Sequence, residues 1–198
     1  MIPKIITQPS AEALTIAECR SHLNLYAYDV DSDGVYSHPD DDMILDMQTA
    51  AREMCEDFTG LSLVRKTYEV AIDEFPEDDG AIELPMPPLV SVTSINVGVT
   101  SDALMTSDEY VVDDYSRPAR ILPATTWPVV TTSTNLVKVR YEAGFGEDSD
   151  GGERLPYAAR AAILVTLTYL YENRGGEVEL PPAAIALLRP LRIRLGMA

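Results

Sequence analysis

The 198-residue sequence is poor in the residue types that carry most enzyme chemistry. It has two cysteines, two histidines and one tryptophan, and only 15 lysines and arginines against 32 aspartates and glutamates. Two distant cysteines give no zinc-binding spacing, and neither a G-x-S-x-G nucleophile motif nor a phosphate-binding glycine loop occurs. The formal net charge of −17 argues against a protein that grips nucleic-acid phosphates, because that requires clustered Lys and Arg. These absences predict a protein that is not an enzyme and uses no cofactor.

Long hydrophobic runs are also missing. The longest strongly apolar stretch, Ala158 to Leu170, is too short to span a bilayer. The first residues hold a single Lys and no apolar block of the kind that marks a secretory signal. Cys19 and Cys55 both fall in predicted helices, where we interpret them as small buried apolar side chains. We therefore expect no membrane association and no disulfide.

Two helices are predicted in the first third of the chain. Thr15 and Glu18 form a capping-box pattern, which starts a helix running to about Tyr26. A second helix runs from Asp41 to Gly60, with aspartates at its start and a glycine suited to end it. Its apolar residues recur at spacings of three and four and are predicted to be buried: Ile44, Met47, Ala51, Met54 and Phe58.

The middle of the chain changes to an alternating pattern typical of strands. Short extended segments are predicted at residues 64–72, 81–84, 90–99, 109–113, 120–122 and 136–141. Prolines at 85, 87 and 88 cannot donate to a strand ladder, so the chain bends there or runs along a sheet edge. This spacing of strands and turns favours a small antiparallel sheet or barrel.

Two further helices are predicted at the end of the chain. The first runs from Pro156 to about Arg174 and is apolar nearly all the way round, which indicates the centre of the fold or a subunit interface. The second starts at Pro181. The sequence thus predicts an α+β fold with three segments: N-terminal helices at 1–62, a β insertion at 63–146, and C-terminal helices at 147–198 that complete a helical bundle.

A series of short segments stands at the boundaries of these elements. They are Leu14–Glu18 with His22-Leu23, Asp41–Gly60, Tyr68 with Phe75-Pro76, Ile82–Ile95, Tyr110–Val112, Trp127-Pro128, Tyr141–Gly146, Leu155-Pro156, Ala159–Leu164 and Tyr169–Arg174. No single segment is specific, but their order and spacing over most of the chain resemble the long-form head–tail connector (adaptor) family of tailed phages. The loop between the first two helices is longer and more acidic than that pattern.

The resemblance implies a structural virion protein of the neck, made in the host cytoplasm and encoded by a phage, a prophage or a gene transfer agent. Such proteins form a ring, usually twelve-fold, beneath the portal. The implied partners are copies of the same chain, the portal protein, and a stopper or tail-completion protein. The ring would extend the DNA channel, and DNA would pass through without specific binding. A stopper or other neck component is the nearest alternative.

The C-terminal tail is the candidate portal-docking site. No acidic residue follows Glu179, and the tail holds Arg189, Arg192 and Arg194 beside Leu191 and Leu195. Cations near a helix C-terminus are favoured by the helix dipole, which would explain them without any partner. The family resemblance implies instead that this end binds the portal.

The apolar helix from Pro156 to Arg174 is the candidate ring interface, together with the β insertion. A closed ring needs two different complementary faces on each subunit. On the helix the interface residues are predicted to be Ala158, Ala162, Leu167 and Tyr171.

An acidic loop raises a different hypothesis, that of a calcium-binding interaction module. Asp29, Asp31, Asp33 and Asp40, with Gly34, read as D-x-D-x-D-G-x5-D, close to the loop of an EF-hand. Against it stand the short final Asp, a preceding proline and the lack of a second loop. A hydrolase that uses these carboxylates with His38 would need a concave site that the sequence does not indicate.

Overall fold

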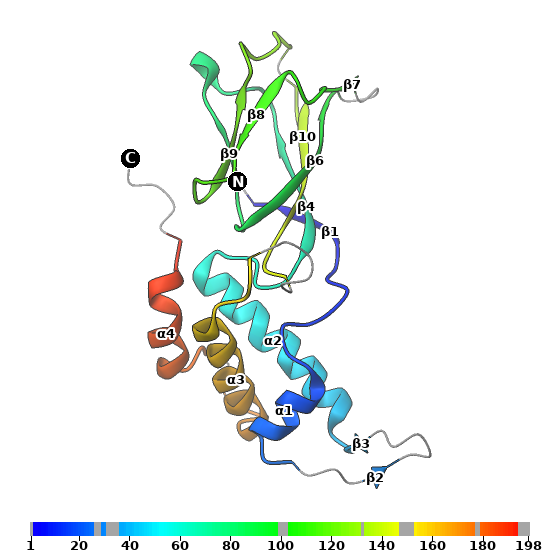
Figure 1. The fold of residues 1–198 in the computed structure, drawn as a ribbon, viewed down its shortest axis with the longest axis vertical. Helices are drawn as coiled ribbons and strands as arrows, with labels where there is room; N and C mark the ends of the chain where they lie inside the picture. Colours follow the sequence, from blue (N-terminus) through cyan, green and yellow to red (C-terminus); the bar gives the residue numbers. More distant parts are fainter. Residues whose placement is uncertain are drawn as a thin grey trace. The chain divides into compact units, whose positions relative to one another are not determined.

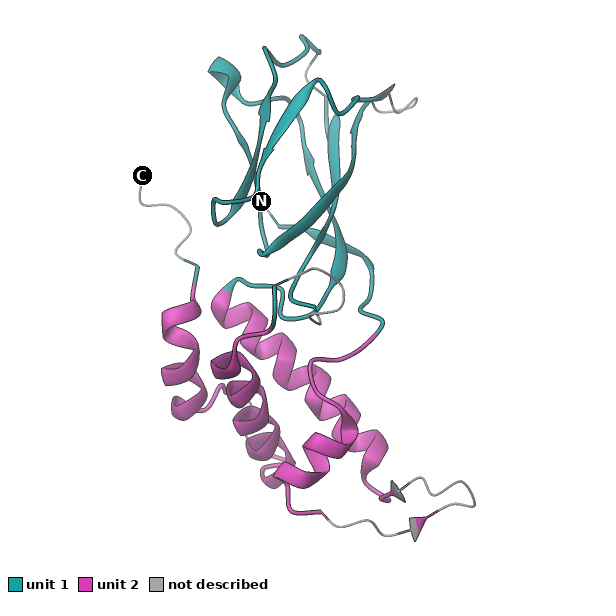
Figure 2. Ribbon diagram, in the orientation of Figure 1, with its two compact units in different colours: residues 1–10, 60–154, 193–198 teal, residues 11–59, 155–192 magenta. Residues whose placement is uncertain are grey.

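The computed structural model describes residues 2–25, 29–30, 36–98, 103–131, 133–146, 153–176 and 179–193. The chain divides into two compact units, shown in Figure 2. The first, here called the β unit, comprises residues 1–10, 60–154 and 193–198; the second, the α unit, comprises residues 11–59 and 155–192. Helices and antiparallel strands are both present, so the predicted α+β class is confirmed.

The α unit is built from helices that pack on one another (Figure 1). They are α1 Ile16–His22, α2 Asp41–Thr59, α3 Tyr157–Glu172 and α4 Pro182–Leu188, followed by the 3-10 turn η3 Arg189–Leu191. Helix α2 packs against α3 and α4, and α1 packs against α2 and α3. A short hairpin, β2 Asp29–Val30 with β3 Tyr36–Ser37, lies between α1 and α2 in the chain.

The start of α1 is confirmed, and its end is not. The Glu18 N–H donates to Thr15 Oγ1 at 3.3 Å and the Thr15 N–H donates to Glu18 Oε2 at 2.9 Å, which is the predicted capping box. The helix was predicted to reach about Tyr26 but ends at His22. The physical reason is Asn24, which has a left-handed φ of 54° that interrupts the helix.

The buried face of α2 differs from the prediction. Ile44 and Ala51 are buried as expected, but Met47, Met54 and Phe58 are only partly buried. The stripe that faces inward also contains polar side chains: Gln48, Arg52, Glu56 and Thr59. A prediction from apolar periodicity treats every polar residue as exposed. These polar side chains are buried because they have hydrogen-bond partners inside the unit.

The β unit contains two antiparallel sheets. The strands are β1 Lys4–Thr7, β4 Lys66–Ile72, β5 Ile82–Leu84, β6 Leu89–Val97, β7 Ala103–Leu104, β8 Tyr110–Asp113, β9 Ala119–Pro123 and β10 Val137–Ala143, with the 3-10 turn η1 Glu77–Asp79 before β5. The five-stranded sheet has the order β1-β4-β10-β6-β7, and the three-stranded sheet has the order β5-β9-β8. Strands β1 and β7 were not predicted from the sequence.

One hydrophobic cluster fills the β unit and draws on both sheets. Tyr68 and Val70 of β4 are buried on one face, as the alternation predicted, and Ile121 of β9 joins them. The rings of Tyr68 and Tyr141 stack with centroids 5.7 Å apart. The Tyr141 hydroxyl donates to the Pro85 carbonyl at 2.8 Å, so this buried polar group is satisfied, and burial raises its pKa.

The division into units differs from the predicted segments at the N-terminus. Strand β1 pairs antiparallel with β4, with Lys4 opposite Glu69 and Ile5 opposite Tyr68. Residues 1–10 therefore belong to the β unit, whereas the predicted first segment assigned them to the helices. Among the described residues, no helix is both long and apolar enough to cross a membrane.

Candidate assembly surfaces

Three of the predicted portal-docking residues are described, and they lie directly after α4. Arg189 and Leu191 lie in η3, and Arg192 follows directly; both arginines are exposed and Leu191 is partly buried. The Arg192 guanidinium lies 5.2 Å from the centroid of the Phe58 ring, a cation–π contact within the α unit. Leu188, fully buried, anchors this end to the helices. Arg194 and Leu195 lie outside the described residues.

The predicted ring-interface residues on α3 fall on two different faces. Ala162 and Leu167 are fully buried inside the α unit, so they support the helix and offer no surface to another subunit. Ala158 and Tyr171 are partly exposed. The partly exposed positions of α3 are mostly apolar, since Ala161, Leu164 and Val165 share this exposure, as expected for a helix with no polar face.

Tyr171 is also held by two partners in its own unit. Its hydroxyl donates to Asp40 Oδ2 at 2.6 Å, and the Arg174 guanidinium stacks on its ring at 4.5 Å. Arg174 Nη2 lies 3.3 Å from the same Asp40 oxygen. The hydrogen bond from Tyr171, with help from Arg174, lowers the pKa of Asp40.

These contacts bear on the calcium hypothesis. Asp40 was to supply the last ligand, and its carboxylate instead accepts from a phenol and lies beside a guanidinium. Asp31 and Asp33 lie outside the described residues, as does the side chain of Asp29. In the part of the chain that the structure describes, no three His, Cys, Asp or Glu side chains are grouped to hold a metal ion.

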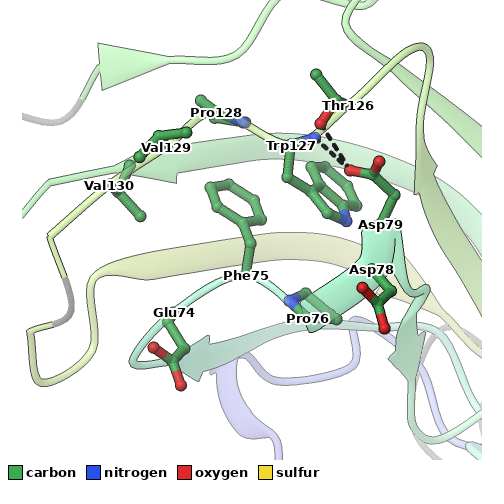
Figure 3. A pocket seen from close by; sticks show the side chains of 10 residues that line it. All are labelled: Glu74, Phe75, Pro76, Asp78, Asp79, Thr126, Trp127, Pro128, Val129 and Val130. Carbon is green, nitrogen blue, oxygen red and sulfur yellow. Dashed lines mark hydrogen bonds between the residues drawn. The ribbon is translucent and has the colours of Figure 1, made fainter.

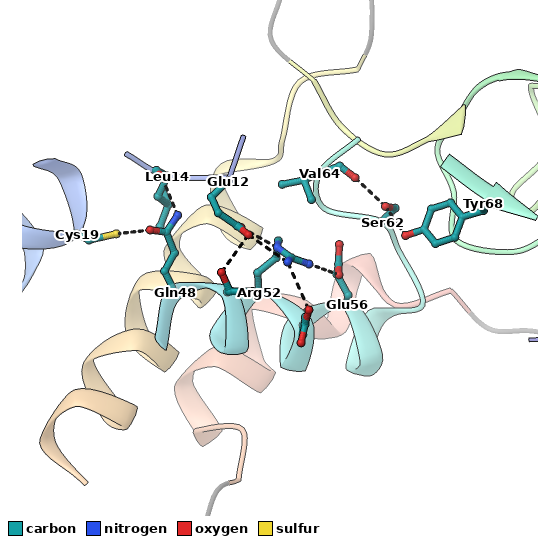
Figure 4. Close-up of polar contacts among 11 residues, drawn as sticks. Glu12, Leu14, Cys19, Gln48, Arg52, Glu56, Ser62, Val64 and Tyr68 are labelled. Atoms are coloured by element: carbon teal, nitrogen blue, oxygen red, sulfur yellow. Dashed lines mark hydrogen bonds and ion pairs between the residues drawn. The ribbon is translucent and has the colours of Figure 1, made fainter. Parts of the chain in front are cut away.

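A buried ion cluster joins the segment before α1 to α2, as Figure 4 shows. Arg52 is 1% exposed; its Nε donates to Glu12 Oε2 at 2.8 Å and its Nη1 donates to Glu56 Oε2 at 2.6 Å. Burial alone would lower the pKa of Arg52, but the bond to Glu12 and the charge of Glu56 outweigh it and raise the pKa. Gln48 adds a second tie, because its Nε2 donates to the Leu14 carbonyl at 2.6 Å. This cluster was not predicted from the sequence.

A shallow hollow of about 330 Å³ lies on the β unit, and Figure 3 shows its lining. Its floor is the stacked pair of Phe75 and Trp127, with ring centroids 4.7 Å apart. The Trp127 indole N–H donates to the Gly80 carbonyl, and the Trp127 backbone N–H donates to Asp79 Oδ1 at 2.9 Å. Both rings belong to the hydrophobic cluster of the β unit.

The two histidines and the two cysteines all lie in the α unit. His38 Nδ1 accepts from the Asp40 N–H at 3.1 Å, and the His38 N–H donates to Asp41 Oδ2 at 2.8 Å, which shapes the turn into α2. His22 is exposed at the end of α1. Cys19 and Cys55 are free and fully buried, and burial raises the pKa of each thiol to about 11. No nucleophile with an adjacent base is formed by these residues.

Comparison with solved structures shows a shared fold over the whole chain. A chain in the neck of an empty gene transfer agent (GTA) particle, computed with C6 symmetry, superposes with a TM-score of 0.76 at 22% identity, covering 100% of this chain and 99% of that chain. A chain in the virion of a native gene transfer agent particle gives a TM-score of 0.74 at 21% identity, with 100% and 99% coverage. A chain in the neck of a native particle, computed with C12 symmetry, gives a TM-score of 0.72 at 22% identity with the same coverage.

No family model and no curated protein sequence matches the chain. The structural comparison therefore defines the class by fold alone: the α+β architecture found in these neck and virion chains. The resemblance to head–tail connectors that the sequence motifs indicated is supported at this level.

Proposed function

We propose that this chain is a structural virion protein of the neck, a head–tail adaptor that forms a ring on the portal. The observation that carries the proposal is the fold shared over 100% of the chain with chains of neck assemblies computed with C6 and C12 symmetry. An adaptor is not an enzyme. The absence of a nucleophile–base pair among the site residues above is compatible with this role.

The proposed ring is a homo-oligomer of twelve subunits, and α3 contributes to its interface. Of the predicted interface residues, Ala158 and Tyr171 are partly exposed and can contact a neighbouring subunit. Ala162 and Leu167 are buried within the α unit. Partly exposed apolar side chains on one helix lose solvent contact when a neighbour covers them, which stabilises association.

The proposed portal-docking surface is the basic end of the chain. Arg189, Leu191 and Arg192 are grouped after α4, and Arg194 and Leu195 extend the set in the sequence. In a chain of net charge −17, an exposed group of arginines is a specific place for an acidic partner to bind. The opposite side of the ring would receive a stopper or tail-completion protein.

The acidic composition supports the proposed relation to DNA. A channel wall that repels phosphates lets DNA pass without binding, since binding would require neutralising Lys and Arg. The proposed ring therefore extends the DNA channel and makes no specific contact with it.

Negative-stain microscopy of the protein mixed with the portal protein of the same particle tests the proposal, with the protein alone as control. Added ring density on the portal is the expected result and gives the symmetry. If the chain does not bind the isolated portal but binds a portal that already carries another ring, it is a stopper or a later neck component. A chain that binds neither would contradict the proposal.

A further inference from the structure

The outer edges of the two sheets in the β unit are not protected equally. An edge strand presents unpaired N–H and C=O groups, so proteins shorten it or place Pro, Lys or a register shift there. Strand β7 has two residues, and β5 has three and is followed by Pro85. Strand β1 carries Lys4, which disfavours a basic or apolar strand but not an acidic one, and its register with β4 shifts between Ile5 and Thr7. Strand β8 has none of these features.

Among the described residues β8 pairs with β9 alone, and apolar side chains on β8 and just after it are exposed. Val111 is 55% exposed and Val112 is 36% exposed, and Tyr115 just beyond the strand is 97% exposed. Its register with β9 is continuous from Tyr110 to Asp113. Its surroundings are acidic, with Asp108, Glu109, Asp113 and Asp114 in one short stretch, of which Asp113 is paired with Arg120. A strand that adds here should be apolar and carry positive charge.

Strand β1 is complementary to β8, because it is apolar and positively charged. All four of its residues are exposed, including Ile5 at 41% and Ile6 at 37%, and Ile2 before it is 94% exposed. Lys4 is its charged residue, and no acid occurs in the chain before Glu12. Strands β1 and β8 are each four residues long and are outermost strands of different sheets.

We propose that β8 of one subunit pairs with β1 of the next subunit in the ring. The pairing joins the three-stranded sheet of one copy to the five-stranded sheet of its neighbour. It uses two different surfaces that every copy has, which is the heterologous contact that a closed ring requires. Lys4 approaches the acidic stretch around β8, and the exposed isoleucines and valines cover each other. This inference rests on the proposed ring.

Disulfide trapping in the ring assembled on the portal tests the pairing. Four double variants combine Ile5→Cys or Ile6→Cys with Val111→Cys or Val112→Cys. Cys19 and Cys55 are fully buried and will not react. Because successive side chains point to opposite faces, only the combinations that share a face in the true register can form a disulfide. We expect a ladder of covalent multimers from those combinations and none from single-cysteine variants.

A matched pair of lysine variants gives an independent measurement. Val112 and Val90 are each 36% exposed, but Val90 lies on β6, a strand that takes no part in the proposed pairing. We expect Val112→Lys to weaken ring formation on the portal by about tenfold or more, and Val90→Lys to leave it unchanged.

The outcomes separate this inference from the proposed function. If wild-type rings form on the portal but no double variant gives a ladder and Val112→Lys behaves like Val90→Lys, the pairing is wrong and the adaptor role stands. If the wild-type chain forms no ring on the portal, the proposed function and the pairing both fail.

Discussion

The α unit and the β unit bury different kinds of side chains. The α unit encloses Gln48, Arg52, Glu56, Thr59 and Thr166. Among the described residues of the β unit, the buried polar or charged side chains are Ser62 and Lys66, and its core is a cluster of aliphatic and aromatic residues. In the α unit the buried polar groups are satisfied by hydrogen bonds and an ion pair, whereas the core of the β unit is held by the packing of apolar and aromatic side chains.

The comparison can be tested because the chain holds a single tryptophan, Trp127, which reports on the β unit. Circular dichroism at helical wavelengths reports mainly on the α unit. Each variant below is therefore expected to move one signal more than the other.

The largest effect is expected from Arg52→Ala. The change leaves Glu56, whose side chain is 4% exposed, and Glu12 without their shared cation, which costs about 3–5 kcal/mol for a buried pair. Urea unfolding followed by circular dichroism should show the loss. The control is Arg174→Ala, which lies in the same unit and is followed by the same signal; its own side chain and its partner Asp40 are more exposed, so the expected cost is below about 1 kcal/mol. Equal losses for both variants would contradict the claim that charge organises the α unit.

A close backbone approach makes Gly144→Ala the corresponding test in the β unit. Gly144 has a φ of 124°, and a Cβ there would lie 2.1 Å from the Val64 carbonyl oxygen. We expect a loss of at least about 2 kcal/mol, seen as a shift of the Trp127 unfolding transition. Gly175→Ala, in the α unit and followed by the helical signal, is the control, because a Cβ at that position meets nothing within 4 Å. A Gly144→Ala protein as stable as this control would show that the β unit tolerates changes of shape.

A smaller effect is expected at the start of α1. Thr15→Ala removes the hydroxyl that accepts from the Glu18 N–H, which costs about 1 kcal/mol. Thr15→Ser keeps the hydroxyl and should cost much less. The helical signal is the measurement, and a Trp127 transition that moves as far as the helical one would weaken the separation of the two units.

The smallest effect concerns Asp113 at the surface of the β unit. Hydrogen bonds from Ser116 and then Arg120 lower the pKa of its carboxyl from 3.8 to about 2. A lowered folded-state pKa contributes stability that is present above pH 3.8 and is lost as the pH falls toward 2. NMR titration of Asp113 should give a midpoint near 2, and Ser116→Ala should move it upward. A midpoint at the ordinary value in the wild-type protein would contradict the role of Ser116.

The elements that the sequence predicted well are those with strong local signals. The capping box at Thr15, the helix from Asp41 and the alternation in β4 each depend on neighbours within a few residues, so they could be read without the fold. Strand β1 could not, because its four residues are stabilised by β4, more than fifty residues away in the chain.

The candidate surfaces also divide into features visible in the local sequence and features that depend on distant parts of the chain. The basic residues after α4 are visible as charge in the sequence. Which face of α3 is open depends on α2 and α4, so Ala162 and Leu167 could not be distinguished from Ala158 by composition. The burial of Arg52 was missed because only the fold brings Glu12 to it.

The division of the chain between its units has a consequence during synthesis on the ribosome. Every described strand of the β unit has been made once residue 154 emerges, since β1 is already present at the beginning of the chain. Helix α2 must wait for α3 and α4, which are made last and which pack on it. A nascent chain halted before residue 157 would therefore hold all the described strands of the β unit, and helix α2 without the helices that cover it.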